Sequence, residues 1–497
     1  MALQINKVLI SDAVDASCRE ILEGAGVAVD YKPGLSKEDL LQCIKEYDGL
    51  IVRSATKVTA EVIAAGSRLK MIGRAGTGVD NIDLEAATKH GIIVMNTPGG
   101  NTISAAEYTC TLMCSLARNV PQGYATMKAG RWDRKKFMGV ELCGKTLAIV
   151  GLGRIGREVA GRMQAFGMRT IGYDPIVSAE EAAQFKVEYL ELKDIWPIAD
   201  FVTVHTPLIP ATRGLMNDKV FSECKKGIRV INVARGGIID EGALLRALES
   251  GQCGGAGLDV FTEEPPKEWA LVDHPNVVAT PHLGASTVEA QLKVAQEIAQ
   301  SFVDARAGKP LFGIVNVPEL SNALNPDSSP WVALTSRLAQ LLQAISTNNI
   351  KSIKLCLTGP NMKGRSRFLT SAALVGCLDN ANLVNARSLG RAAGVEVTVC
   401  LCEGAEGVSL SCVGGVSVCG TVLGGAPVLT GLNDVTFNLV SLSGTLVITK
   451  ATTLVDLIPK LSQINSVTQS GDVIVANVSA APKTTPPGCL ATVTLNC

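Results

Sequence analysis

The stretch from Gly144 to Asp174 constrains the fold of this chain more than any other feature. An apolar run there leads into the pattern Gly-x-Gly-x-x-Gly, formed by Gly151, Gly153 and Gly156, and a helix-like segment follows. A second apolar run ends in Asp174, about 20 residues beyond the glycines, where a dinucleotide site places an acid. This order of strand, glycine turn, helix, strand and acid predicts a domain that binds a nicotinamide dinucleotide.

Each position of this pattern has a physical task. Gly151 permits a tight strand-to-helix turn, Gly153 lets the backbone approach a pyrophosphate, and Gly156 lets the helix pack closely on the strand. The helix N-terminus binds phosphates through its free N–H groups and its dipole. Asp174 accepts hydrogen bonds from the ribose hydroxyls and repels a 2′-phosphate, and no Arg or Lys follows it at 175–177, so NAD is favoured over NADP. A purely structural glycine turn would leave Asp174 unexplained.

Composition narrows the class of protein. The 497 residues give room for about three domains of ordinary size. Lys plus Arg equals Asp plus Glu, 46 of each, so nothing indicates a nucleic-acid partner. The N-terminus lacks a signal-peptide pattern and the 15 cysteines form no Cys-x-x-Cys pair, so we expect reduced thiols and a cytoplasmic location. The uncharged stretch Gly407–Asn433 alternates like strands and turns, so we expect no membrane segment.

Residues 1–98 alternate β-branched runs with segments of helical period, which predicts a parallel sheet covered on both faces. In such sheets, ligand-binding groups gather beyond the carboxyl ends of the strands, where Arg53 and Arg74 stand. We expect strands at Lys7–Ile10, Val27–Tyr31, Gly49–Arg53, Leu69–Ile72 and Ile92–Asn96, and helices at Ala13–Leu22, Lys37–Glu46, Thr59–Ala65 and Asp83–His90.

Residues 99–286 form a second α/β unit around the glycine pattern. We expect a helix at Thr102–Ala117 and a polar loop at Gly123–Met138, which carries Arg134. The amphipathic segment Val288–Ala307 predicts a long helix that returns to complete the first unit. Further strands are expected at Phe201–Val204, Arg229–Asn232, Gly257–Val260 and Val277–Ala279.

The character of the chain changes beyond Val317. A Pro-, Ser- and Asn-rich joint is followed by a helix pattern around Val332–Ile345 and then by alternating strands to about residue 436. The end of the chain predicts a strand at Thr445–Thr449, a helix at Thr453–Ile464 and a strand at Val473–Val478. This charge-poor extension has no catalytic cluster, which suggests assembly or regulation.

Three side chains after strands of the second unit can perform acid–base chemistry beside a nicotinamide. Arg235 can grip a carboxylate and polarise the neighbouring oxygen. His282 titrates near neutrality and can exchange the hydroxyl proton, while Glu264 would fix its tautomer and favour its protonated form. Asp259 is expected to bond the nicotinamide carboxamide. The other three histidines show no metal-ligand spacing with it, so we expect no metal site.

Five sequence motifs, in the same order along the chain, together resemble those of one enzyme family. Residues 1–312 resemble the D-isomer-specific 2-hydroxyacid dehydrogenase family throughout, and the charge-poor tail resembles that of its long members. The motifs are GLGRIG with Asp174, HTPL at His205–Leu208, NVARGGIIDEGAL at Asn232–Leu244, LDVFTEEPP at Leu258–Pro266 and PHLGAS at 281–286.

The resemblance implies a Rossmann-type nucleotide-binding domain, a flavodoxin-like substrate domain and an α+β C-terminal extension. It implies a substrate domain at 1–98 completed by 287–317, an NAD-binding domain at 99–286, an intervening domain at 318–442 and a shortened or diverged ACT-like regulatory domain at 443–497. It also implies a homo-oligomer, a dimer or tetramer.

The activity implied is NAD-dependent oxidation of 3-phospho-D-glycerate to 3-phosphohydroxypyruvate, the first step of serine synthesis. Arg235, Glu264 and His282 become the catalytic residues. Substrate contacts are implied for Arg53, Arg74, Asn101 and Arg134. Cofactor contacts are implied for Thr77, Gly151, Gly153, Arg154, Ile155, Gly156, Asp174, Thr206, Ala234, Arg235, Asp259, His282, Leu283, Gly284 and Ala285.

Two alternatives stay open at this point. The chain could act on unphosphorylated glycerate or hydroxypyruvate, although the extra arginines and the tail favour a phosphorylated substrate. It could also be an NAD-sensing binding protein of the corepressor kind, because such proteins keep the same three side chains. Their extensions are polar and disordered, whereas this one is apolar and patterned for folding.

Overall fold

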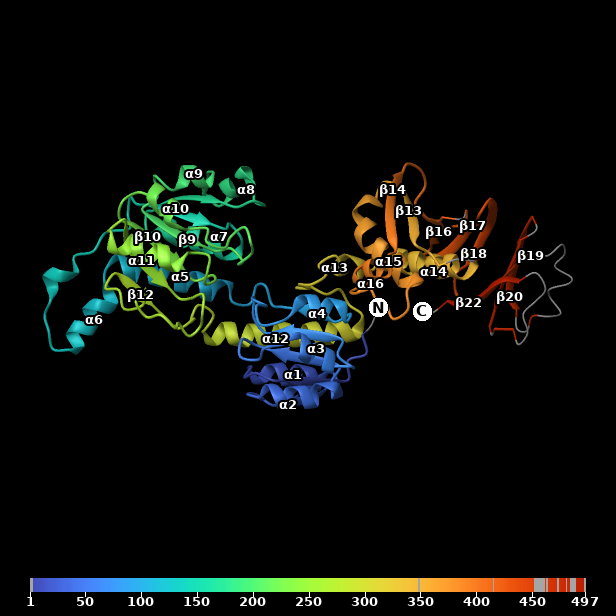
Figure 1. Cartoon of the computed structure of the whole chain (residues 1–497), viewed down its shortest axis with the longest axis horizontal. Coiled ribbons are helices and arrows are strands. Elements are labelled where there is room, and N and C mark those ends of the chain that lie inside the picture. The colour runs from blue at the N-terminus through green and yellow to red at the C-terminus, as the bar shows by residue number, and fades with distance from the viewer. Residues whose placement is uncertain are drawn as a thin grey trace. The chain divides into compact units, whose positions relative to one another are not determined.

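The computed structural model describes residues 3–346, 349–413, 415–450, 461, 464–471, 473–479, 481–482 and 489–495. The chain divides into two compact units, one made of Met1–Thr97 with Ala295–Cys497 and the other of Pro98–Val294. The first unit is therefore discontinuous in sequence. Figure 1 labels the helices and strands of both units.

The first unit begins with a parallel sheet and its covering helices. These are β1 (Lys7–Ile10), α1 (Ala16–Gly24), β2 (Ala28–Tyr31), α2 (Lys37–Cys43), β3 (Gly49–Val52), α3 (Ala60–Ala65), β4 (Met71–Arg74), α4 (Leu84–Lys89) and β5 (Ile93–Met95). The strand order β2-β1-β3-β4-β5 is that of flavodoxin-like folds and confirms the predicted fold. The returning chain packs on this sheet through Phe302, whose ring lies so close to Gly49 and Gly73 that a Cβ at either glycine would clash with it. Further along, Ile314 forms an antiparallel β-bridge with Met95.

The second unit is built on a seven-stranded parallel sheet. Its strands are β6 (Thr146–Val150), β7 (Arg169–Tyr173), β8 (Glu188–Tyr189), β9 (Phe201–Val204), β10 (Ile228–Asn232), β11 (Cys253–Leu258) and β12 (Val277–Ala279). The order β12-β11-β10-β9-β6-β7-β8 is the doubly wound Rossmann order with one added strand, as predicted. The order reverses between β6 and β9, which is where such sheets bind ligands at the carboxyl ends of their strands.

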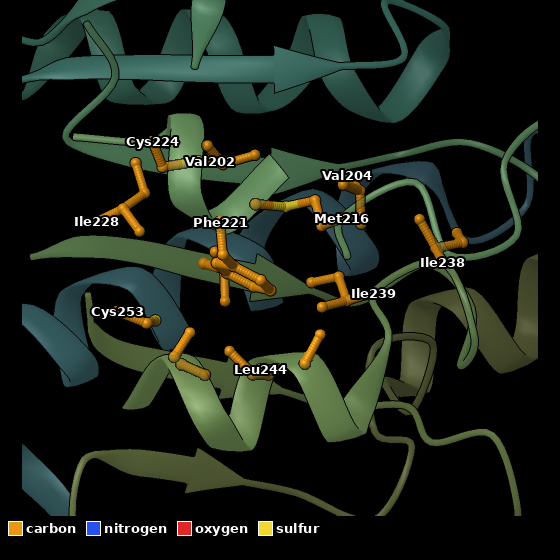
Figure 2. Packing of buried hydrophobic residues seen from close by; sticks show 14 of the residues in the cluster. Val202, Val204, Met216, Phe221, Cys224, Ile228, Ile238, Ile239, Leu244 and Cys253 are labelled. Atoms are coloured by element: carbon orange, nitrogen blue, oxygen red, sulfur yellow. The ribbon is translucent and has the colours of Figure 1, made fainter. Parts of the chain in front are cut away.

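Helices cover both faces of this sheet. They are α5 (Thr102–Ala117), α7 (Arg154–Ala165), α8 (Ala179–Gln184), α9 (Leu192–Ile195), α10 (Asp218–Glu223) and α11 (Glu241–Glu249). The unit also contains α6 (Val120–Lys128), which buries no side chain, and the first residues of α12 (Val288–Ala307). One core cluster joins α10 and α11 to Val202 and Val204 through Phe221 and Leu244 (Figure 2). A second cluster joins α5 and α7 to alternate strand residues such as Leu147. Burial on both sides explains why these strands are almost entirely apolar.

Two further sheets follow in the first unit. After α13 (Leu320–Ala323) and α14 (Ser329–Ile345) come β13 (Ser352–Thr358), α15 (Ser366–Cys377), α16 (Ala386–Ala393), β14 (Glu396–Cys402), β15 (Gly407–Cys412), β16 (Ser417–Leu423), β17 (Ala426–Leu432), β18 (Val435–Ser441), β19 (Gly444–Lys450), β20 (Ile464–Ser470), β21 (Val473–Val478) and β22 (Cys489–Leu495). The sheet orders are β14-β13-β15-β16-β17-β18 and β20-β21-β19-β22. They confirm the predicted α+β extension.

Some predicted elements differ from those observed. The loop expected at Gly123–Met138 contains the end of α6 and a short 3-10 turn at Arg134–Phe137, so that prediction is wrong. Because α6 buries none of its side chains, it has no apolar stripe to reveal it. The strand expected at Gly257–Val260 is observed as β11, which begins four residues earlier, at Cys253, and ends two residues earlier, at Leu258. The helix expected at Thr453–Ile464 lies outside the described residues except for Leu461 and Ile464, the residue that begins β20.

The described residues contain neither a membrane-spanning helix nor a metal-binding cluster. None of their helices combines the length and the apolar character needed to cross a bilayer. The uncharged stretch Gly407–Asn433 instead contains β15, β16 and β17. Within the same ranges, no group of three or more His, Cys, Asp or Glu side chains is arranged to hold a metal ion.

Candidate active site

The turn between β6 and α7 has the geometry of a phosphate-binding turn. Gly151 has φ +99°, and a Cβ there would lie 2.6 Å from the carbonyl oxygen of His205. A Cβ at Gly156 would lie 2.1 Å from the carbonyl oxygen of Gly151, so only glycine lets α7 begin this close to β6. Gly153 has no atom within 4 Å of its Cβ position, which leaves its backbone open to a ligand. Arg154 and Ile155 then open α7, whose first N–H groups attract anions.

Asp174 stands directly after β7 with its carboxylate held beside this turn. One carboxylate oxygen accepts a hydrogen bond from the Leu152 N–H at 2.8 Å, and the other accepts from Ile176 N–H at 2.8 Å. The Thr206 hydroxyl, which follows β9, is buried without a hydrogen-bond partner among the described residues. An open glycine backbone, a placed carboxylate and an unpaired hydroxyl at the switch point of the sheet all fit a dinucleotide.

His282 and Glu264 form a hydrogen-bonded ion pair. The Nδ1 atom of His282 lies 2.7 Å from Oε2 of Glu264, and Oε1 of Glu264 accepts from the Phe261 N–H at 3.2 Å. The side chains are 49% and 39% exposed, so the pair reaches solvent. No hydrogen bond to Nε2 of His282 occurs within the described part of the chain. That nitrogen is therefore available to a substrate.

The charges around His282 favour its protonated form. The hydrogen bond that His282 donates to Glu264 is the largest influence on the pKa of His282 and raises it, although burial opposes this; the charges of Glu264 and Asp259 add to the increase. The positive charge of Arg235 lowers the pKa of His282. For Glu264, burial acts to raise the pKa, but the bond to His282 and the nearby charges outweigh it and lower the pKa. Both shifts favour the imidazolium–carboxylate form of the pair once His282 has taken up a proton.

Arg235 lies on a loop that packs directly against the Glu264 loop. A Cβ at Gly236 would lie 2.0 Å from the carbonyl carbon and oxygen of Phe261, so the two backbones touch. Asn232, at the end of β10, braces the loop: its Oδ1 accepts from Ala234 N–H at 3.0 Å and its Nδ2 donates to the Arg235 carbonyl at 2.7 Å. Arg235, Glu264 and His282 are thus brought together in the second unit, as the motifs predicted.

Asp259 supports the loop that carries His282. It is 1% exposed, and one of its oxygens accepts from the Thr280 hydroxyl and the Leu283 N–H, both at 2.7 Å. The other oxygen accepts from Gly284 N–H at 2.7 Å. His282 itself has φ +56°, a left-handed conformation that these bonds hold in place. Asp259 therefore fixes the 282–284 loop, in addition to the contact with the carboxamide expected from sequence.

Other predicted residues occupy strand ends and surface positions. In the first unit, Arg53 follows β3 and donates to the Ala13 carbonyl at 3.0 Å, and Arg74 ends β4 with its guanidinium over Gly76. Thr77 accepts from the Asn96 side chain through its carbonyl oxygen. In the second unit, Asn101 precedes α5, Arg134 is exposed on its 3-10 turn, and Ala285 accepts from Gln291.

The sequence reasoning missed several residues that position these groups. Asn232 and Thr280 hold the loops of Arg235 and His282, and Asp12 and Asn81 hold the loop of Arg53. Asn232 and Asp12 are 2% and 4% exposed. A polar residue at the end of an otherwise apolar strand was the signal that could have found them, because buried polar groups require partners.

Comparisons with known proteins agree with this geometry. A family model described as D-isomer specific 2-hydroxyacid dehydrogenase, NAD binding domain, matches residues 110–284. The D-3-phosphoglycerate dehydrogenase of Homo sapiens is 54% identical over 448 residues, which cover 87% of this chain and 84% of the relative. The Bacillus subtilis enzyme of the same name is 42% identical, covering 78% of this chain and 75% of the relative.

The fold of the chain is also similar to that of solved structures. A glyoxylate reductase from Paecilomyes thermophila superposes with a TM-score of 0.58 at 29% identity, covering 63% of this chain and 99% of its own. A protein from Thermus thermophilus superposes with a TM-score of 0.57 at 34% identity, covering 62% of this chain and 99% of its own.

The chain belongs to the D-isomer specific 2-hydroxyacid dehydrogenase family. It is an NAD-dependent dehydrogenase with a Rossmann-type domain, which confirms the predictions of fold class, enzyme class and cofactor. Within the family, the relatives that match it over most of its length carry the name D-3-phosphoglycerate dehydrogenase.

Proposed function

We propose that the chain oxidises 3-phospho-D-glycerate to 3-phosphohydroxypyruvate with NAD, as the first step of L-serine biosynthesis. The observation that carries this proposal is the 2.7 Å pair of His282 and Glu264 beside Arg235, in a chain 54% identical to human D-3-phosphoglycerate dehydrogenase. The relatives from rat and from Bacillus subtilis bear the same name, which supports the same substrate.

The three catalytic side chains have distinct tasks in this reaction. Arg235 binds the substrate carboxylate and orients the C2 hydroxyl toward His282. His282 accepts the hydroxyl proton at Nε2, while Glu264 stabilises the resulting imidazolium through Nδ1. NAD, held by the β6–α7 turn, supplies the acceptor for the hydride that leaves C2. In the reverse direction His282 returns the proton to the keto oxygen.

The remaining contacts are proposed on the same basis. Arg53, Arg74, Asn101 and Arg134 bind the doubly anionic substrate, and Arg134 reads the phosphate. The glycine turn with Arg154 and Ile155, together with Asp174 and Thr206, would hold NAD. Further cofactor contacts are proposed for Thr77, Ala234, Asp259 and the loop from His282 to Ala285.

We further propose the domain division expected from the sequence. The substrate domain is 1–98 with 287–317, the NAD-binding domain is 99–286, the intervening domain is 318–442, and 443–497 is a diverged ACT-like domain. The bridge of Ile314 to Met95 supports the return of the chain to the first domain. The change from a six-stranded to a four-stranded sheet between β18 and β19 supports the boundary near 442.

A homo-oligomer and a cytoplasmic location complete the proposal. The segment from α6 to Met138 exposes Tyr124, Met127, Trp132 and Met138 by 64%, 55%, 79% and 88%, which supports burial against a second copy. The fourteen described cysteines are free, as suits a reducing compartment. Light scattering measures the mass of the assembly formed by the wild type and by Trp132→Glu. We expect the variant to form a smaller assembly.

Initial rates of NADH formation test the substrate. Purified chain is mixed with NAD and either 3-phospho-D-glycerate or D-glycerate, with the keto product trapped so that the equilibrium does not hide turnover. We expect a kcat/KM at least tenfold higher for the phosphorylated acid. Higher turnover of D-glycerate would indicate a different dehydrogenase, and NAD binding without turnover of either would indicate a sensor.

A further inference from the structure

Two cysteines face one another across the edge of the six-stranded sheet. Strand β14 forms that edge and pairs in parallel with β13, in a register that places Cys400 opposite Cys356. On β13, Ile353, Leu355 and Leu357 point into the core and are 0% exposed, so Cys356 belongs to the other face. Register partners on parallel strands share a face, which places both thiols on the same side of the sheet.

The two thiols are close enough to react with one another. Neighbouring strands lie about 4.7–4.9 Å apart, within the range of about 4.4–6.8 Å that separates the Cα atoms of disulfide-linked residues. Burial raises the pKa of Cys356, and the neighbouring Cys400 adds to this effect. Neither residue belongs to the active site proposed above. Both thiols are partly exposed, so a small reagent can reach them.

We propose that Cys356 and Cys400 form a redox-responsive thiol pair, which a low-molecular-weight disulfide oxidises to an intrachain disulfide between β13 and β14. Cys400 attacks the reagent first, because it lies on β14 at the edge of the sheet. The reagent's sulfur–sulfur bond breaks, one small thiol leaves, and a mixed disulfide remains on Cys400.

Cys356 then attacks the Cys400 sulfur and releases the second small thiol. The two protein thiols lose two electrons and two protons, and both pass to the reagent, which ends as two thiols. The new bond closes the chain between residues 356 and 400, a segment that includes α15 and α16. It also ties the edge strand to the sheet, so the oxidised form should unfold at a higher temperature.

The strand itself supplies a matched control. Cys402 lies two residues further along β14 and is exposed, but its register partner is Thr358. It therefore shares the strand and the face of Cys400 without a thiol opposite. Cys143, an exposed cysteine of the other unit, reports whether the oxidant has reacted at all.

The test uses the full-length chain and oxidised glutathione. The protein is oxidised, its remaining thiols are alkylated, and its peptides are analysed by mass spectrometry with and without dithiothreitol. We expect a reducible Cys356–Cys400 cross-link in the wild type and in Cys402→Ser, and its complete loss in Cys356→Ser and Cys400→Ser. In Cys356→Ser, glutathione should instead remain bound to Cys400.

The wild-type measurement decides the matter even if a variant folds poorly. Glutathione on Cys143 together with only mixed disulfides at 356 and 400, or a cross-link through Cys402, would overturn the proposal. An oxidised wild type that is cross-linked but melts at the temperature of the reduced form would overturn the stabilising role. Since no step involves the acid–base residues, these outcomes are independent of the proposed activity.

Discussion

Replacing Glu264 by glutamine tests the electrostatic basis of the acid–base pair. The amide keeps an acceptor for the Nδ1–H of His282 and removes the negative charge. Because the hydrogen bond and the charge of Glu264 raise the pKa of His282, the substitution should lower that pKa. Reduction of the keto acid needs imidazolium, which exists below the pKa, so its rate should begin to fall at a lower pH. Oxidation needs neutral imidazole, so its acidic limb should also move to lower pH.

The size of the effect follows from the geometry. A hydrogen bond to a charged group contributes about 1.5–3 kcal/mol. With the His282 and Glu264 side chains 49% and 39% exposed, solvent screening reduces the contribution of the charge to about 1 kcal/mol. That corresponds to about a fivefold loss of kcat/KM for reduction on the alkaline side of the profile.

The assay is the pH dependence of kcat/KM in both directions, with Glu263→Gln as control. Glu263 is the adjacent carboxylate, 53% exposed at its side chain, and it pairs with Lys267 at 2.7 Å instead of with His282. The control profile should match the wild type. Profiles of Glu264→Gln that superpose on the wild type in both directions would refute the assigned role of Glu264.

Substitutions at four other positions test single contacts. His282→Asn, which tolerates the left-handed backbone, should lower kcat by about 10²–10⁴ while NAD still binds; normal turnover would exclude His282 as the acid–base residue. Asp174→Ala should reduce the NAD-over-NADP ratio of kcat/KM, and an unchanged ratio would contradict its role. Arg134→Ala should raise KM for 3-phospho-D-glycerate more than for D-glycerate; equal effects would contradict phosphate reading. Thr280→Val should lower kcat about tenfold and Thr280→Ser restore it, if the hydroxyl positions the loop of His282 through Asp259.

The nucleotide-binding turn was predictable because several constraints coincide in a short stretch. Gly151, Gly153, Gly156 and Asp174 occupy the positions that backbone geometry and ribose chemistry require, and the structure shows the close contacts that exclude a Cβ at 151 and 156. Helix α5 has the predicted bounds, because its periodic apolar residues continue without a break between Asn101 and Arg118.

Elements without such signals were not predictable. Strand β11 reads CGGAGL, and its glycines conceal it, although they are what lets α5 lie against it: a Cβ at Gly255 would lie 3.0 Å from Leu116. Helix α6 buries no side chain, so its sequence has no periodic apolar pattern that would predict a helix. Thr280 acts through a hydrogen bond to Asp259, a residue of a different segment, which spacing along the chain cannot reveal. Asn232 acts locally, on Ala234 and Arg235 of its own loop, but the apolar strand pattern before it gives no sign of that role.

The backbone contact at Gly236 has a consequence for how this enzyme can change. Since the peptide after Phe261 occupies the space where Gly236 lacks a side chain, the backbone that carries Arg235 cannot move toward the backbone that carries Glu264. The two loops that carry Arg235 and Glu264 are therefore held together as one unit. We expect a change of substrate preference to arise at the substrate-binding arginines outside these two loops, while the acid–base residues stay the same.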